Sequence, residues 1–111
     1  MNEGDVFLTS LVQADGKVKD RPAVLLRQMP PFGDWLICGV STQLHLAVPD
    51  FDELIDRRDD DFAGSGLKAP SVIRLGFLAV FPAARFIGVI GTIAPERHSR
   101  LLERLSDHLQ P

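Results

Sequence analysis

One arginine stands where a polar loop gives way to an apolar strand. Arg21 follows the polar residues 13–20 and precedes the run Pro22-Ala23-Val24-Leu25-Leu26. A strand can hold the start of this side chain in place, and the planar guanidinium fork fits the oxygens of an anion such as phosphate. The alternative is an ordinary surface arginine, since exposed charges often contribute little. Arg21 is therefore a candidate anion-binding residue.

Strand-forming residues dominate the chain up to residue 93. Runs of Val, Ile, Leu and Phe between turn-forming Gly and Pro residues predict strands at 4–12, 21–28, 35–41, 71–81 and 86–93. Residues 13–20, the Pro-Pro-Phe-Gly-Asp segment 30–34 and residues 63–66 are interpreted as loops or turns. Residues 44–61 have no clean period. The segments around Arg21 thus predict antiparallel strands joined by short connections.

The last segment changes to a helical period. Apolar residues and a histidine recur at i, i+3, i+4 and i+7 at positions 98, 101, 102, 105 and 109. Pro95 and Glu96 suit a helix start, although Ala94 is a poor N-cap. Charged residues are expected on the outer face: Arg97, Arg100, Glu103, Arg104 and Asp107. The predicted fold is mainly β, a small SH3-like barrel of antiparallel strands closed by a C-terminal α-helix.

Length and composition indicate one domain over residues 1–111. No apolar run reaches the roughly 20 residues of a membrane span, and the N-terminus lacks signal-peptide features, so we expect a cytoplasmic protein without a membrane partner. Cys38 is the single cysteine, which excludes an internal disulfide and a cysteine-rich metal site. We expect it to be a buried thiol.

The charge is unevenly distributed. A net charge of −3 argues against a surface densely coated with nucleic-acid-binding cations. Residues 50–61 hold seven acids and two arginines, which leaves the remainder slightly basic. This acidic run is interpreted as a solvated loop. The alternative is a patch that tunes the access of an anionic ligand or meets a basic partner.

Five segments together, in this order, resemble the MazF/PemK family of toxin endoribonucleases from bacterial toxin-antitoxin pairs. They are Gly4-Asp5-Val6, Arg21-Pro22-Ala23-Val24-Leu25, Val40-Ser41-Thr42-Gln43, Pro70-Ser71-Val72-Ile73, and Ile90-Gly91-Thr92-Ile93 before Pro95-Glu96. The resemblance covers essentially the whole chain. It implies an SH3-like barrel, a homodimer, cofactor- and metal-independent cleavage of single-stranded RNA, and inhibition by a cognate antitoxin protein.

Residue by residue, the resemblance places the catalytic arginine on Arg21 and the catalytic hydroxyl on Ser41, where the family carries threonine. Thr42 and Gln43 follow as substrate-binding positions, and Lys17 and Lys19 occupy the loop that covers the RNA channel in the family. The implied reaction is attack of the RNA 2′-hydroxyl on the adjacent phosphorus, which gives a 2′,3′-cyclic phosphate and a 5′-hydroxyl. Arginine is a poor base because its pKa lies above about 12, so the proton acceptor is unassigned.

The roles of the histidines and of two aromatic residues have more than one interpretation. His45 lies two residues after Gln43 and titrates near neutrality, but a plain loop histidine explains it too. His98 and His108 are expected to be structural. Phe32 and Trp35 are suited to stacking on an unpaired base, whereas burial is the expectation for Trp35.

One segment departs from the family pattern. Gly76-Phe77-Leu78-Ala79 stand where many members carry an acid, a glutamine, an apolar residue and an arginine. Arg74 and Arg85 are candidates to compensate, and surface roles explain them as well. The apolar residues favour a stronger subunit interface or a catalytically degenerate member that binds antitoxin or RNA. A third reading is an SH3-like domain unrelated to toxins that binds peptides.

Overall fold

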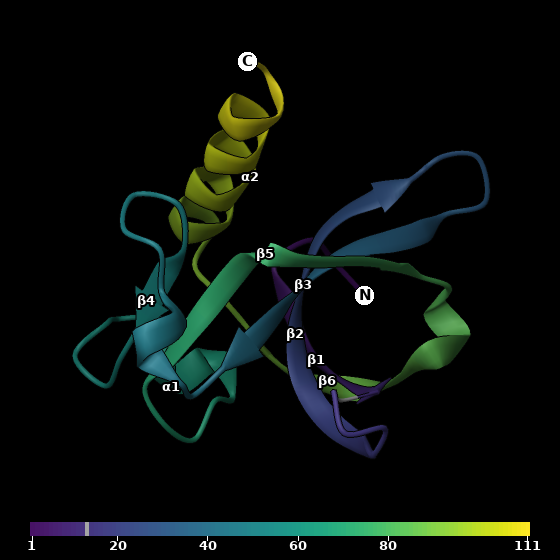
Figure 1. Ribbon diagram of the computed structural model, residues 1–111, viewed down its shortest axis with the longest axis horizontal. Helices are drawn as coiled ribbons and strands as arrows, with labels where there is room; N and C mark the ends of the chain where they lie inside the picture. Colours follow the sequence, from purple (N-terminus) through teal and green to yellow (C-terminus); the bar gives the residue numbers. More distant parts are fainter. Residues whose placement is uncertain (13) are drawn as a thin grey trace.

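The computed structural model describes residues 1–12 and 14–111, which form six strands, two 3₁₀ helices, one short α-helix and a final long helix (Figure 1). In chain order the elements are β1 (Asp5–Val12), β2 (Val18–Met29), β3 (Asp34–Ser41), η1 (Leu44–Leu46), β4 (Glu53–Ile55), α1 (Phe62–Ser65), β5 (Ser71–Phe81), η2 (Ala83–Arg85), β6 (Phe86–Thr92) and α2 (Pro95–Leu109). The five predicted strands and the C-terminal helix are confirmed. None of the helices in these ranges is long and apolar enough to cross a membrane.

The strands form one antiparallel sheet in the order β4-β5-β3-β2-β1-β6. The mainly β fold with a C-terminal helix is confirmed, but the sheet is open because β4 and β6 are its two edges. Figure 1 shows β5 running across the molecule to η2, which turns the chain back into β6. Register shifts in β2 and β5 bend the sheet, as β-bulges do.

Both faces of the bent sheet carry apolar clusters. Because successive strand residues point to opposite faces, Ala23 and Leu25 join one cluster while Val24 and Leu26 join the other. The first cluster also holds Phe7, Trp35 and Ile37. The second is covered by α2 through Leu101 and Leu105. This double burial explains why the strands are apolar without alternation.

Trp35 and Cys38 are both buried in β3, as expected from the sequence. Trp35 is 5% exposed and is one of the residues of the Phe7 cluster, so it offers no free ring for stacking. Burial raises the pKa of the Cys38 thiol to about 12. The thiol therefore stays protonated at neutral pH and is structural.

The acidic run 50–61 is not a solvated loop, and this prediction was wrong. Asp52 and Glu53 are buried, and Glu53 begins β4. The two carboxylate oxygens of Asp52 accept hydrogen bonds from the backbone N–H groups of Leu75 and Val48, each at 2.9 Å. This carboxylate therefore ties the segment before β4 to β5.

Arg97 was expected on the outer face of the helix and is instead buried, with a side chain 8% exposed. Its guanidinium contacts Glu53 at 3.0 Å and Asp61 at 2.7 Å. Arg100 and Arg104 also pair with Glu53. Three arginines on one face of α2 thus neutralise the acids, and that neutralisation makes their burial possible.

Candidate anion-binding site

Arg21 and Ser41 lie on the same face of the sheet, just beyond the point where the pairing of β2 with β3 ends. The last residue pair between β2 and β3 on this side is Ala23 opposite Gly39. Arg21 lies two residues beyond Ala23, and Ser41 lies two residues beyond Gly39. Side chains two apart on a strand share a face, so the guanidinium and the hydroxyl emerge on the same side of these two strands.

The Arg21 side chain forms no ion pair with the residues that the structure describes. The residue is half-buried and is registered opposite Thr9 of β1. None of the salt bridges found between described residues involves Arg21. A guanidinium that is partly desolvated and has no carboxylate partner is suited to bind an anion.

The Ser41 hydroxyl has a defined orientation. Its Oγ accepts a hydrogen bond of 3.1 Å from the backbone N–H of Gln43. Because the oxygen serves as the acceptor there, the hydroxyl proton is available for a different partner. Gln43 itself is exposed just after the strand. Ser41 can therefore donate to an anion bound on the face that it shares with Arg21.

A second arginine lies on this face, across β3. Arg74 of β5 is registered opposite Gly39, and Val72 is registered opposite Ser41. Arg74 is half-buried and has no ion pair among the residues that the structure places. The sequence identified Arg74 only as a possible compensating residue, since its face depends on the register of β5 with β3.

Lys19 extends the row of cations along β2. It lies two residues before Arg21 and therefore shares its face, and it is exposed. Asp20 points to the other face, where it accepts a hydrogen bond of 3.1 Å from Ser10 Oγ. Lys17 is exposed in the turn before β2. We call Lys19, Arg21 and Arg74 the basic face.

Phe77 lies on the same side of the sheet as the basic face, over Gly39. The three residues 75–77 form a bulge in β5, because Gly39 is registered opposite Arg74 while Cys38 is registered opposite Leu78. A Cβ atom on Gly39 would lie 2.9 Å from Cδ1 of Phe77. The ring therefore lies directly against the Gly39 backbone. The segment that departs from the family pattern thus contributes an aromatic ring on this side of the sheet.

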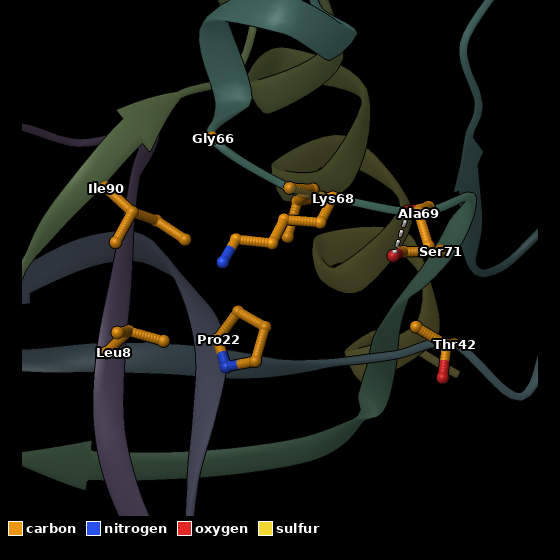
Figure 2. Close-up of a pocket in the computed structure, with 9 residues that line it drawn as sticks. Leu8, Pro22, Thr42, Gly66, Lys68, Ala69, Ser71 and Ile90 are labelled. Atoms are coloured by element: carbon orange, nitrogen blue, oxygen red, sulfur yellow. Dashed lines mark hydrogen bonds between the residues drawn. The ribbon is translucent and has the colours of Figure 1, made fainter.

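A pocket of about 390 Å³ lies on the opposite face of β2 (Figure 2). Its lining includes Leu8 and Pro22, the neighbours of Thr9 and Arg21, so the pocket and the basic face lie back to back. Figure 2 shows the Lys68 side chain extending across the pocket toward Pro22. Thr42 also lines this pocket and is therefore not grouped with Arg21.

The other basic candidates have local roles. The Arg85 guanidinium lies 4.7 Å from the centre of the Phe81 ring, in a cation–π contact. His98 Nε2 lies 2.8 Å from the carbonyl oxygen of Leu26, which ties α2 to β2. The His108 ring packs 4.8 Å from that of Phe51. His45 is exposed in η1.

The chain matches the model of a family described as PemK-like, MazF-like toxin of type II toxin-antitoxin system, over residues 2–109. The chain belongs to this family. A solved structure of the same fold is Mycobacterium tuberculosis toxin MazF-mt6, with a TM-score of 0.69, 18% sequence identity and 95% of each chain covered. No curated protein matches the chain. Membership of this toxin family implies an antitoxin partner and gives the shared face of Arg21 and Ser41 a chemical context.

Proposed function

We propose that this MazF/PemK-like toxin is a cytoplasmic endoribonuclease that cleaves single-stranded RNA with Arg21 and Ser41. The observation that supports it most is the placement of two donors on one face, on the neighbouring strands β2 and β3: an oriented hydroxyl and a guanidinium with no ion pair among the described residues. These two donors can contact the same phosphate group. Their arrangement fits phosphoryl chemistry better than peptide binding, which needs no such pair.

The reaction is a displacement within the RNA chain. The 2′-oxygen forms a bond to phosphorus, the bond from phosphorus to the 5′-oxygen breaks, and the products are a 2′,3′-cyclic phosphate and a 5′-hydroxyl. The 2′-hydroxyl loses its proton and the leaving 5′-oxygen gains one. The atoms and charges of the reaction therefore balance without a metal or cofactor. Negative charge grows on the non-bridging oxygens as the five-coordinate state forms.

Arg21 and Ser41 stabilise that growing charge. Fixed donors aimed at oxygens that gain charge contribute about 3–4 kcal/mol each when they are excluded from water. Arg21 is the main donor because its charge is permanent and its fork can bond two oxygens. Ser41 adds the second donor. Neither residue acts as the base, and the proton acceptor stays unassigned.

Lys17 and Lys19 bind the phosphates that flank the cleaved one. Such contacts increase affinity in a salt-dependent way and carry no sequence information. Gln43 follows Ser41 and extends the substrate contacts beyond β3. Thr42 remains a candidate for the substrate-binding set, although it lies at the pocket rather than beside Arg21.

A homodimer and an antitoxin complete the proposal. Apolar side chains are exposed along the outer part of β5 and along the edge strand β6, at Leu78, Val80, Ile87 and Val89. Exposed apolar groups gathered in this way are typical of association surfaces. We assign this surface to a second copy of the chain. A neighbouring reading frame that encodes a small protein with an acidic, extended C-terminal tail would support the antitoxin assignment.

Incubation of the purified protein with single-stranded RNA of mixed sequence, in the presence of a chelator, tests the activity. Wild type should leave 5′-hydroxyl and cyclic-phosphate ends, and Arg21→Ala should abolish cleavage. The matched control is Arg27→Ala, which removes an exposed arginine of the same strand that pairs with Glu3. Absence of cleavage across varied sequences would contradict the proposal.

The second candidate function is a catalytically degenerate toxin that binds antitoxin or RNA without cleaving it. The replacement of polar family residues by Gly76-Phe77-Leu78-Ala79 favours it. Two measurements separate the two functions. In the incubation described above, the degenerate protein leaves the RNA intact. In a gel-shift assay, it still binds RNA or antitoxin.

A further inference from the structure

We propose that Phe77 is a stacking surface for one unpaired base of the RNA held on the basic face. This inference rests on the proposed function, because it assumes that RNA lies beside Arg21 and Ser41. It goes further by naming how the protein recognises a base. Stacking on an aromatic ring replaces the polar contacts that the departure at residues 76–79 removes.

The position of Phe77 places its ring one nucleotide from the reacting phosphate. The ring lies against Gly39, and Gly39 is registered between Ala23 of β2 and Arg74 of β5. By strand spacing, Gly39 lies about 7 Å from Ser41 along β3 and about 8 Å from Arg21 on the diagonal. A base attached to the ribose next to the bound phosphate can reach across these distances.

The ring is also available for a ligand. Phe77 is 38% exposed and belongs to neither apolar cluster of the described residues. None of the aromatic pairs found in that part of the chain includes it. The bulge at 75–77 holds the ring over the sheet although no core requires it there. An aromatic face beside Arg21 and Arg74, which have no ion pair among the residues described, matches the alternation of base and phosphate in single-stranded RNA.

The absence of a side chain at position 39 is part of this arrangement. A Cβ atom there would meet Cδ1 of Phe77 at 2.9 Å and Cγ at 3.2 Å, so the exposed ring would have to turn away. Gly39→Ala therefore moves the ring without removing it and without changing Arg21, Ser41 or Arg74. A comparison of Gly39→Ala with Phe77→Leu therefore distinguishes the effect of moving the ring from the effect of removing it.

The experiment measures binding of a fluorescent 2′-fluoro RNA oligonucleotide of mixed sequence, which the full-length protein cannot cleave because the attacking hydroxyl is absent. Phe77→Leu should weaken binding about 5- to 150-fold, the range that one base stack supplies. Phe77→Trp should retain the affinity, and its indole emission should fall on binding. Gly39→Ala should also weaken binding. The double variant with Gly39→Ala and Phe77→Leu should bind RNA with the same affinity as Phe77→Leu alone.

The matched control is Phe32→Leu. Phe32 is 86% exposed in the turn between β2 and β3, at the far end of these strands from Arg21. This variant makes the same chemical change and should leave binding within twofold of wild type. An oligonucleotide with an abasic residue at the stacked position should bind wild type and Phe77→Leu equally.

The outcomes distinguish the inference from the function on which it rests. If Phe77→Leu binds as wild type does while Arg21→Ala still abolishes cleavage, stacking is refuted and the endoribonuclease stands. If Phe77→Leu changes only the oligomeric state, Phe77 is an interface residue and stacking is refuted. If wild type neither binds nor cleaves RNA, both proposals fail.

Discussion

At the scale of single residues, the site depends on the direction in which two side chains leave their strands. Arg21 was predictable as an anion-binding candidate because a charged residue before a solid apolar run is visible in the sequence. Arg74 and Phe77 were not assigned to the site, because their face depends on a bulge in β5 that hydrophobic periodicity does not reveal. The sequence therefore predicted Lys19 and Arg21 of the basic face and left Arg74 open.

The hydroxyl at position 41 gives a prediction at this scale. Ser41→Ala should lower kcat about 10²-fold, because one fixed donor to the reacting phosphate is lost. Ser41→Thr should match or exceed wild type, since a β-branched side chain restricts the hydroxyl to fewer rotamers. Initial rates on one RNA substrate measure both. An alanine variant as fast as wild type would remove Ser41 from the mechanism.

At the scale of elements, long strands with many β-branched and apolar residues were predictable, and short elements were not. β4, α1 and η1 contain three or four residues each, which is too few for a period to show. β2 begins at Val18 rather than Arg21, because the hairpin with β1 continues through polar residues. The burial of the acidic run was missed since its three cationic partners lie more than 40 residues later, in α2.

Removal of Arg97 tests the contact between α2 and β4. Arg97→Met should lower the free energy of unfolding by about 3–5 kcal/mol, because it leaves the Glu53 and Asp61 carboxylates buried without their main partner. Arg100→Ala is the control. Arg100 also contacts Glu53, but its side chain is 48% exposed, and a loss below about 1 kcal/mol is expected. Urea denaturation of the two variants measures the difference.

The pH dependence of stability follows from Asp61. The hydrogen bond from Arg97 lowers the pKa of this carboxyl in the folded state. The contribution of Asp61 to the free energy of unfolding is therefore complete above the pKa of about 4 in the unfolded state. This contribution is lost as the pH falls through the pKa of Asp61 in the folded state. Denaturation midpoints below pH 4 should decrease less steeply in Asp61→Asn than in wild type. Parallel curves for the two proteins would contradict this linkage.

At the scale of the whole molecule, a net charge of −3 coexists with a basic face because part of the acidic run 50–61 pairs with arginines of α2, away from that face. Glu53, Asp59 and Asp61 all pair with arginines of α2. This pairing removes acidic groups from the surface that RNA would meet. The composition therefore excluded only a surface densely covered with cations. The separation of the acidic run from the basic face became evident from the fold.

The oligomeric state is the prediction at this scale. Light scattering on the eluted protein should give the mass of two chains, since the apolar residues of β5 and β6 are exposed in one copy. A charged substitution at the centre of that surface, Val89→Asp, should shift the population to one chain without unfolding it. The matched control is Val48→Asp, which changes an exposed valine outside the surface. A wild-type monomer would refute the assignment of the surface to a second copy.

The distance in sequence between β4 and α2 has a consequence during synthesis. Arg97 follows Glu53 by 44 residues, and Arg104 lies further along the same helix. A nascent chain on the ribosome therefore carries Glu53 for some time before the arginines that pair with it have been translated. The Glu53 carboxylate can therefore be buried as an ion pair only after α2 has left the exit tunnel.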